Sequence, residues 1–213
     1  KASWSACERS TNGFWMRSSG NRSLATVFSL LVLTCAIGSP EIAFPSTIAA
    51  TDSDELEVRT EPDGGVRATA RIVFDAKPRV VFGILTDYAH WPELFEMRMK
   101  LADLKMHEGI ARTDLRIEHA LLPGERRLVT DSRTVTDRGI VTDLVEGDFK
   151  RYHRAWTLNA ADGGIRTLAD FELFVAIDSM VPDWLVRLAM RRELESHFRI
   201  VKKKAMERAG AER

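Results

Sequence analysis

The stretch from Pro182 to Ala209, PDWLVRLAMRRELESHFRIVKKKAMERA, decides the fold that we predict for this chain. Apolar side chains recur in this stretch at steps of three and four residues, at Val186, Met190, Leu194, His197/Phe198, Val201 and Ala205. Such spacing places them on one face of a long α-helix. A helix with a single apolar stripe is stable only when another element covers that stripe. The residues before Pro182 must therefore supply the covering surface.

Upstream of this helix the sequence predicts an antiparallel sheet. Two strands, Leu56–Arg59 and Val66–Phe74, lie on either side of a strong turn signal at Glu61–Gly65. Six further strands are expected because apolar and polar residues alternate in them and short turn-like joints separate them: Met97–Met106, Ile110–Ala120, Glu125–Val135, Gly139–Val145, Phe149–Leu158 and Ile165–Ile177. Short joints favour antiparallel neighbours.

Two short helices are expected between the first strands and the run of six. The first begins at Pro78, because proline is tolerated at the first helical position, and it ends near Tyr88. Lys77 precedes it and is a poor helix cap. The second is a single turn over Trp91–Phe95, started by Pro92. The predicted fold class is α+β, a curved antiparallel sheet wrapped around the long C-terminal helix, with two short helices after the first strands.

Charge and motif content exclude several functions. Four of the 31 basic and two of the 31 acidic residues lie in the first fifty, which leaves 27 and 29 in the remainder. A nucleic-acid partner is not expected, since such proteins carry a basic excess. Cys7 and Cys35 also lie in the first fifty. No HExxH, GxSxG or phosphate-binding loop occurs, so we expect no metal and no cofactor.

Residues 1–50 are predicted to be an N-terminal extension with a signal peptide. Leu24–Gly38 carries no charge, follows Arg17 and Arg22, and is shorter than the roughly 20 residues of a membrane-spanning helix. We expect cleavage near Ala49 and export to the periplasm or cell envelope; an uncleaved anchor, a lipoprotein signal at Cys35 and a cytosolic chain are the alternatives. Met16 leaves open whether residues 1–15 belong to the leader. Residues 51–65 are interpreted as a linker with the start of the first strand, and residues 66–209 as the folded domain.

Three separated segments resemble a known superfamily. They are Val81–Tyr88 with Trp91–Phe95, then Val145–Tyr152 with Ala155–Leu158, and finally Val181–Leu185. Over residues 66–208 the chain resembles START/Bet v 1-like (SRPBCC) proteins, in particular the polyketide cyclase/dehydrase and lipid transport branch with its coenzyme Q-binding START-like members. The resemblance implies a helix-grip fold with a ligand cavity between sheet and helix. The superfamily includes lipid carriers, quinone-binding proteins, receptors and cyclases, so the resemblance does not choose among these functions.

We predict non-enzymatic binding or transport of an apolar small molecule, a lipid, quinone or isoprenoid-like compound. Ligand cavities are lined mainly by apolar and aromatic side chains. The candidate ligand-binding residues are therefore Phe82, Trp91, Phe95, Leu115, Ile117, His119, Trp156, Phe171, Trp184, Met190, Leu194 and Phe198. Trp156 and Trp184 are also compatible with a plain core position.

Two alternatives and one surface feature complete the sequence-based expectations. The first alternative is a polyketide cyclase or dehydratase, for which His119 with Arg116 or Glu118 could supply acid–base groups. The second is a protein-interaction module. A basic cluster near the end of the long helix fits either helix-dipole stabilisation or transient contact with an anionic membrane surface: Arg199, Lys202, Lys203, Lys204 and Arg208. The sequence does not indicate an oligomeric state.

Overall fold

A computed structural model describes residues 53–120, 122–136, 138–177 and 180–211, and the predicted signal peptide lies outside these ranges. The elements in chain order are β1 (Glu55–Thr60), β2 (Val66–Phe74), α1 (Pro78–Leu85), the 3-10 helix η1 (Tyr88–Leu94), β3 (Arg98–His107), β4 (Ile110–His119), β5 (Leu122–Val135), β6 (Gly139–Gly147), β7 (Phe149–Ala161), the 3-10 turn η2 (Asp162–Gly164), β8 (Arg166–Ile177) and α2 (Asp183–Ala211).

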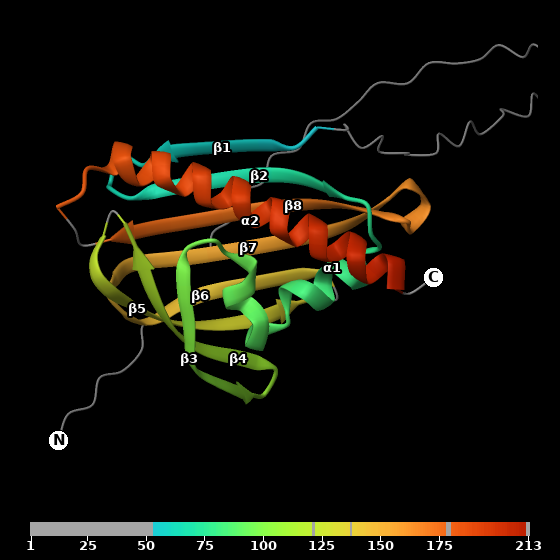
Figure 1. The fold of residues 1–213 in the computed structure, drawn as a ribbon, viewed down its shortest axis with the longest axis horizontal. Helices are drawn as coiled ribbons and strands as arrows, with labels where there is room; N and C mark the ends of the chain where they lie inside the picture. The colour runs from blue at the N-terminus through green and yellow to red at the C-terminus, as the bar shows by residue number, and fades with distance from the viewer. Residues whose placement is uncertain (1–52, 121, 137, 178–179, 212–213) are drawn as a thin grey trace, which may run out of the picture. The chain divides into compact units, whose positions relative to one another are not determined.

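All the strands of the described residues belong to one antiparallel sheet. Its order is β1-β2-β8-β7-β6-β5-β4-β3 (Figure 1). Every neighbouring pair except β2–β8 is a hairpin of consecutive strands, as the short joints predict. The β2–β8 pair runs from Val66 opposite Val175 to Phe74 opposite Thr167. It brings the beginning and the end of the domain together, so α1 follows a strand that is adjacent to the strand preceding α2.

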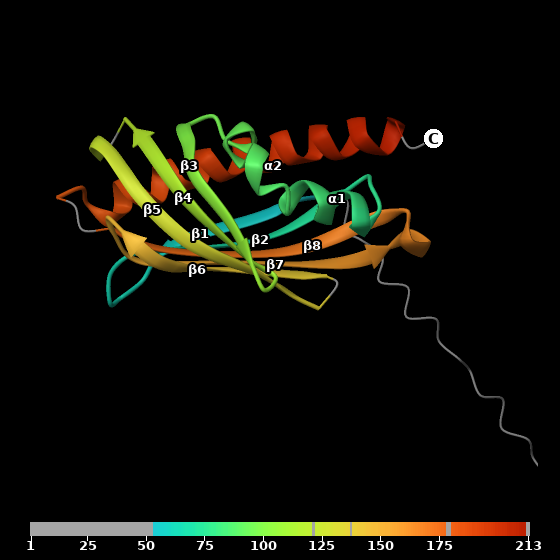
Figure 2. The same ribbon diagram turned by 90° about the horizontal axis from the view of Figure 1, so that it is seen from below.

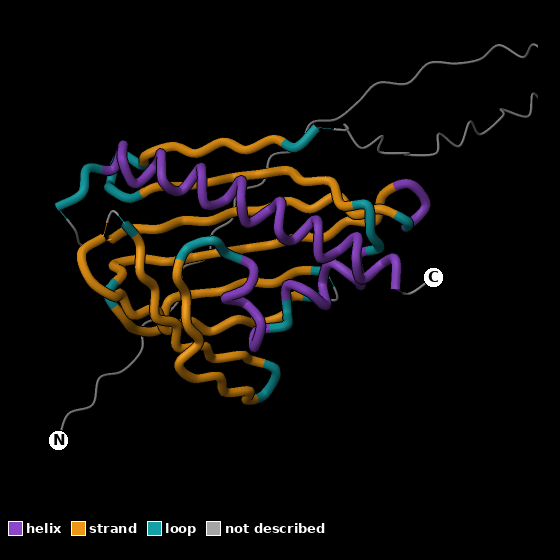
Figure 3. The backbone as a smooth tube through the Cα atoms, in the orientation of Figure 1, coloured by secondary structure: helices purple, strands orange, loops and turns teal. Residues whose placement is uncertain are grey.

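The sheet curves around the helices. Strands β3, β4 and β5 rise out of the plane of β1, β2, β7 and β8 toward α2 (Figure 2). The helices lie on this inner side, with α2 running obliquely over the strands and packing against β1, β2, α1 and η1 (Figure 3). The expected α+β helix-grip architecture is confirmed.

An aromatic cluster joins α2 to the centre of the sheet. Trp156 on β7, Phe171 on β8 and Phe198 on α2 are all buried, with ring centroids 4.6 to 5.8 Å apart in tilted and edge-on arrangements. Val201 and Ala205 extend this buried stripe along the C-terminal half of α2. The apolar periodicity of the helix is therefore the face that packs on the sheet.

The short helices differ from the prediction in one respect. The second helix was expected as a single turn started by Pro92, but η1 already begins at Tyr88 and contains Pro92. The Trp91 indole N–H donates to the Leu85 carbonyl oxygen at 2.9 Å, which folds this segment back onto the end of α1. Lys77 makes no side-chain cap to α1, as its residue type predicts.

Several strands are longer than the sequence pattern indicates. Strand β7 continues to Ala161, because it stays paired with β8 up to Arg166, and β6 continues to Gly147. Strand β5 begins at Leu122, so the expected joint at 123–124 lies inside its first residues. The turn signal between β1 and β2 is confirmed, and Gly65 is required there: its φ is +95°, and a Cβ would lie 2.8 Å from the Val175 carbonyl oxygen.

Within the described ranges, no helix combines the length and the apolar character that crossing a membrane demands. The predicted apolar leader is not part of those ranges, so export stays a prediction.

The aromatic cluster should carry much of the attachment of α2 to the sheet. We expect Phe198→Ala to lower the free energy of unfolding by about 3–5 kcal/mol, since it removes a buried ring and leaves a cavity. Leu188→Ala on the same helix is the control, because Leu188 is 57% exposed and should change stability by less than about 0.5 kcal/mol. Urea denaturation measures both, and equal losses would show that the cluster does not anchor the helix.

Candidate functional site

An apolar cavity of about 160 Å³ lies between the inner face of the sheet and the N-terminal half of α2. Besides Trp91, whose indole N–H is bonded to Leu85, four of its lining residues carry polar groups: His119, Tyr152, Arg154 and Glu193. The remaining lining is aliphatic, aromatic or methionine: Trp91, Phe95, Met97, Met99, Leu115, Ile117, Leu128, Phe149, Leu173, Val175, Ile177, Val186, Ala189, Met190 and Leu194.

Seven of the twelve predicted ligand-binding residues line this cavity: Trp91, Phe95, Leu115, Ile117, His119, Met190 and Leu194. The other five do not: Phe82, Trp156, Phe171, Trp184 and Phe198. Of these, three form the central aromatic cluster, Phe82 is a partly buried residue of α1, and Trp184 is 60% exposed at the start of α2. Ligand contact by any of the twelve stays a prediction.

Several residues that line the cavity are not among the predicted ligand-binding residues. Leu173, Val175 and Ile177 continue the alternation of Phe171 along β8, so the period-two pattern already places them on the same face. Met97 and Met99 come from the beginning of β3 and the residue before it. No local signal distinguishes these two methionines from ordinary strand residues, because only the curvature of the sheet turns them toward α2.

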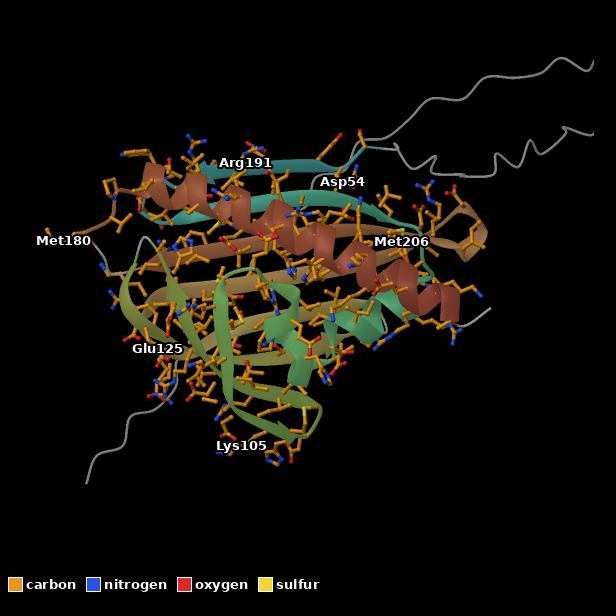
Figure 4. All side chains as sticks on the ribbon, viewed as in Figure 1. Asp54, Lys105, Glu125, Met180, Arg191 and Met206 are labelled. Atoms are coloured by element: carbon orange, nitrogen blue, oxygen red, sulfur yellow. The ribbon has the colours of Figure 1, made fainter. Side chains whose placement is uncertain are left out.

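An open groove, which we name the entrance groove, adjoins the cavity. The two share Met97, His119, Ala189 and Glu193 as lining residues, and Glu125 contributes on the sheet side of the groove (Figure 4). Of the α2 residues that line cavity and groove only Leu194 is buried, and Asp183–Arg192 contains no buried residue. Since buried apolar contacts hold a helix in place, we expect Asp183–Arg192 to be held less firmly than the segment from Leu194 onward.

A row of buried hydroxyl groups crosses the inner face of the sheet next to the cavity. Thr113 on β4 and Thr130 on β5 are cross-strand partners with their hydroxyl oxygens 2.9 Å apart. Ser132 on β5 and Thr142 on β6 form a second pair, also at 2.9 Å. These four residues are almost completely buried. Their mutual hydrogen bonds satisfy polar groups that would otherwise be costly inside the core.

Arg154 on β7 is the next residue in this row. Its Nη2 lies 3.4 Å from the Thr142 hydroxyl, and its guanidinium carbon lies 4.0 Å from the centre of the Trp91 ring. The side chain is only 5% exposed and lines the cavity. The sequence signal for it was present: alternation puts Arg154 on the same face of β7 as Trp156 and Leu158, so a cation stands on an apolar face.

Two further titratable groups lie close to Arg154. Burial raises the pKa of Tyr88, against the opposing effects of the Arg154 charge and a hydrogen bond to Ser132. His197 on α2 is fully buried, and burial lowers its pKa to about 4. Its Nδ1–H donates to the Leu94 carbonyl oxygen at 2.9 Å, and its ring stacks on Phe95. His197 is therefore neutral at physiological pH and joins α2 to the end of η1.

The acid–base groups named for a cyclase have different positions. Arg116 forms ion pairs with Asp114 and Glu125, and neither Arg116 nor Glu118 lines the cavity. His119 does line it, with Nε2 3.7 Å from Oε1 of Glu193. The sequence reading did not identify Glu193. In the part of the chain that the structure covers, no group of His, Cys, Asp and Glu side chains is arranged to hold a metal ion.

The basic cluster near the end of α2 is largely paired with carboxylates. Lys202 binds Asp54, which precedes β1 (Figure 4), at 2.6 Å, and Lys204 binds Glu93 at 2.8 Å. Arg199 and Lys203 also have acidic partners. Such pairing reduces the positive field that an anionic membrane would meet. Membrane contact through this cluster stays a prediction.

The buried His197 makes stability depend on pH. Its pKa rises from about 4 in the folded protein to about 6.5 on unfolding, so the unfolded chain takes up the proton first as the pH falls. We expect this stabilisation to be complete above pH 6.5 and to be lost toward pH 4, by up to about 1.4 kcal/mol per pH unit. Urea unfolding of the wild type and His197→Gln from about pH 7.5 to about pH 4.5 measures the difference, and parallel profiles would contradict a buried neutral imidazole.

Solved structures share this fold over most of their length. A protein from Thermus thermophilus superimposes with a TM-score of 0.56 at 14% identity, covering 67% of this chain and 99% of that one. The Zhui aromatase/cyclase from a Streptomyces species gives 0.52 at 11% identity, covering 72% and 94%. The human StarD13 lipid transfer and protein localization domain gives 0.53 at 16% identity, covering 73% and 85%. At these identities the likeness establishes the fold alone.

Sequence comparison assigns the family. No curated protein matches the chain. The model of the family described as polyketide cyclase / dehydrase and lipid transport matches residues 74–197, from the last residue of β2 to the buried part of α2. This match spans more than half of the chain and agrees with the START/Bet v 1-like neighbours in structure. The chain therefore belongs to the polyketide cyclase / dehydrase and lipid transport family.

Proposed function

We propose that this domain binds an apolar small molecule in the cavity beneath α2 and releases it unchanged. The observation that carries this proposal is the lining of the cavity, in which apolar side chains from the sheet, η1 and α2 surround the free space. Transfer of an alkyl chain from water into such surroundings is favourable by about 0.8 kcal/mol per methylene. A chain of about ten methylenes would thus gain up to roughly 8 kcal/mol, enough for micromolar binding.

The size of the cavity fits a compact ligand and requires an adjustment for a longer one. Apolar cavities of about 150 Å³ stay dry and bind benzene, so a volume of 160 Å³ accepts a ring or short chain directly. A longer molecule extends into the entrance groove or displaces the N-terminal half of α2. Met190 assists this adjustment, because an unbranched methionine adapts its shape to different contacts.

A polyketide cyclase or dehydratase is the second candidate function. It is favoured by the His119–Glu193 pair, which is placed where cavity and groove meet and could position a proton donor and acceptor. Carrier and enzyme differ in what becomes of the bound molecule. A carrier returns an added poly-ketone unchanged, whereas a cyclase returns a ring-closed or dehydrated product that mass spectrometry of the extract detects.

Filling the cavity should abolish binding. Val186 lines the cavity from α2, so Val186→Trp places an indole in the space that the ligand needs. We expect the affinity for 1-decanol, measured by isothermal titration calorimetry, to fall at least about tenfold. Met206→Trp on the same helix is the control, because Met206 is 52% exposed and far along the helix from the cavity. Undiminished binding by Val186→Trp would place the ligand elsewhere.

A further inference from the structure

The polar contacts of Arg154 are unlike those of other arginines on this sheet. Arg112 forms two hydrogen bonds of 2.7 Å with Asp131, and Arg133 binds Asp143 at 2.7 Å, both at exposed positions. Arg154 is 5% exposed, and no carboxylate among the described residues lies within ion-pair distance of it. It is a buried cation without an ion-pair partner, although Glu193 lines the same cavity.

The neighbours of Arg154 satisfy its guanidinium only in part. The hydrogen bond from Nη2 to Thr142 is long, at 3.4 Å, and Nε has no acceptor although it is fully enclosed. The Trp91 ring offers a cation–π contact, which compensates for part of the lost hydration but supplies no hydrogen-bond acceptor to the N–H groups. The arginine guanidinium is a permanent cation in proteins. The burial of an unpaired charge is unfavourable unless something else supplies the opposite charge.

The position of Arg154 in the cavity indicates where that opposite charge would be. Arg154 lines the cavity but not the entrance groove, and the Trp91 of η1 covers it. The lining next to it along β8, Leu173 and Val175, is apolar. Apart from His119 and Glu193 at the junction with the groove, and Tyr152 opposite Val175, the lining that a ligand would meet on its way to the guanidinium is apolar.

We propose that the ligand is an amphipathic carboxylic acid whose carboxylate binds the Arg154 guanidinium while its apolar body fills the cavity. This inference rests on the proposed binding function and adds the chemical class of the ligand. A single guanidinium matches the charge and the two oxygens of one carboxylate, and Arg154 lines the cavity. Arg154 acts here as a binding residue, since a guanidinium that stays protonated is no proton carrier.

A matched pair of ligands tests the proposal. Decanoic acid and 1-decanol share their chain and differ in the head group, so calorimetric titration of both at about pH 7.5, where the acid is ionised, isolates the contribution of the carboxylate. We expect the wild type to bind the acid about ten- to a hundredfold more tightly than the alcohol. Arg154→Met keeps an unbranched side chain against Trp91 and should bind both ligands with the affinity that the wild type has for the alcohol.

Two further variants complete the test. Arg154→Lys keeps the charge without the planar fork, so its preference for the acid should lie between those of the wild type and Arg154→Met. Arg71→Met is the control: Arg71 is exposed, pairs with Asp170 and lies outside the cavity, so the preference should be unchanged. If Arg154→Met does not fold, as judged by near-ultraviolet circular dichroism, the preference of Arg154→Lys for the acid over the alcohol tests the proposal by itself.

The outcomes separate this inference from the function on which it rests. Equal affinity of the wild type for acid and alcohol, or a preference for the acid that survives in the Arg154 variants, overturns the carboxylate assignment and leaves apolar binding in place. Absence of binding of both ligands to the wild type overturns the proposed function and the inference together.

Discussion

The structure depends on the packing of one helix, α2, against the inner face of a curved sheet. The contact is uneven along the helix. From Leu194 to Ala205 its apolar stripe is buried against the aromatic cluster and the strands β1 and β2, whereas Asp183–Arg192 buries no residue completely. Val186 and Met190 of Asp183–Arg192 are only partly buried and line the cavity, so the same helix that closes the core also covers the cavity.

Much of the fold follows from residue patterns, because both helix and strands use periodic apolar positions. The period of α2, the proline at the start of α1 and the turn residues between strands predict the elements to within a few residues. The extent of β7 was not predictable, since pairing with β8 and not local alternation decides where it ends. The position of η1 likewise depends on a tertiary contact, the hydrogen bond from Trp91 to Leu85.

The candidate site was only partly predictable. Residues such as Leu115, Ile117 and Leu194 follow from the faces of their elements. The distinction between core and cavity does not, because Trp156 and Phe171 have the same pattern but fill the space under the buried half of α2. Arg154 is the instructive case. The alternation along β7 predicts an apolar residue at this position, but the residue is charged. A local conflict of this kind commonly marks a functional position.

We propose that the space beneath α2 holds one amphipathic ligand. Native mass spectrometry of the purified domain in the presence of decanoic acid tests it most directly, because it counts bound molecules. We predict one molecule per chain, lost on cavity filling at Val186 and retained when the exposed Met206 is replaced. A protein that stays empty, or that takes up many molecules with no defined number, would contradict the claim.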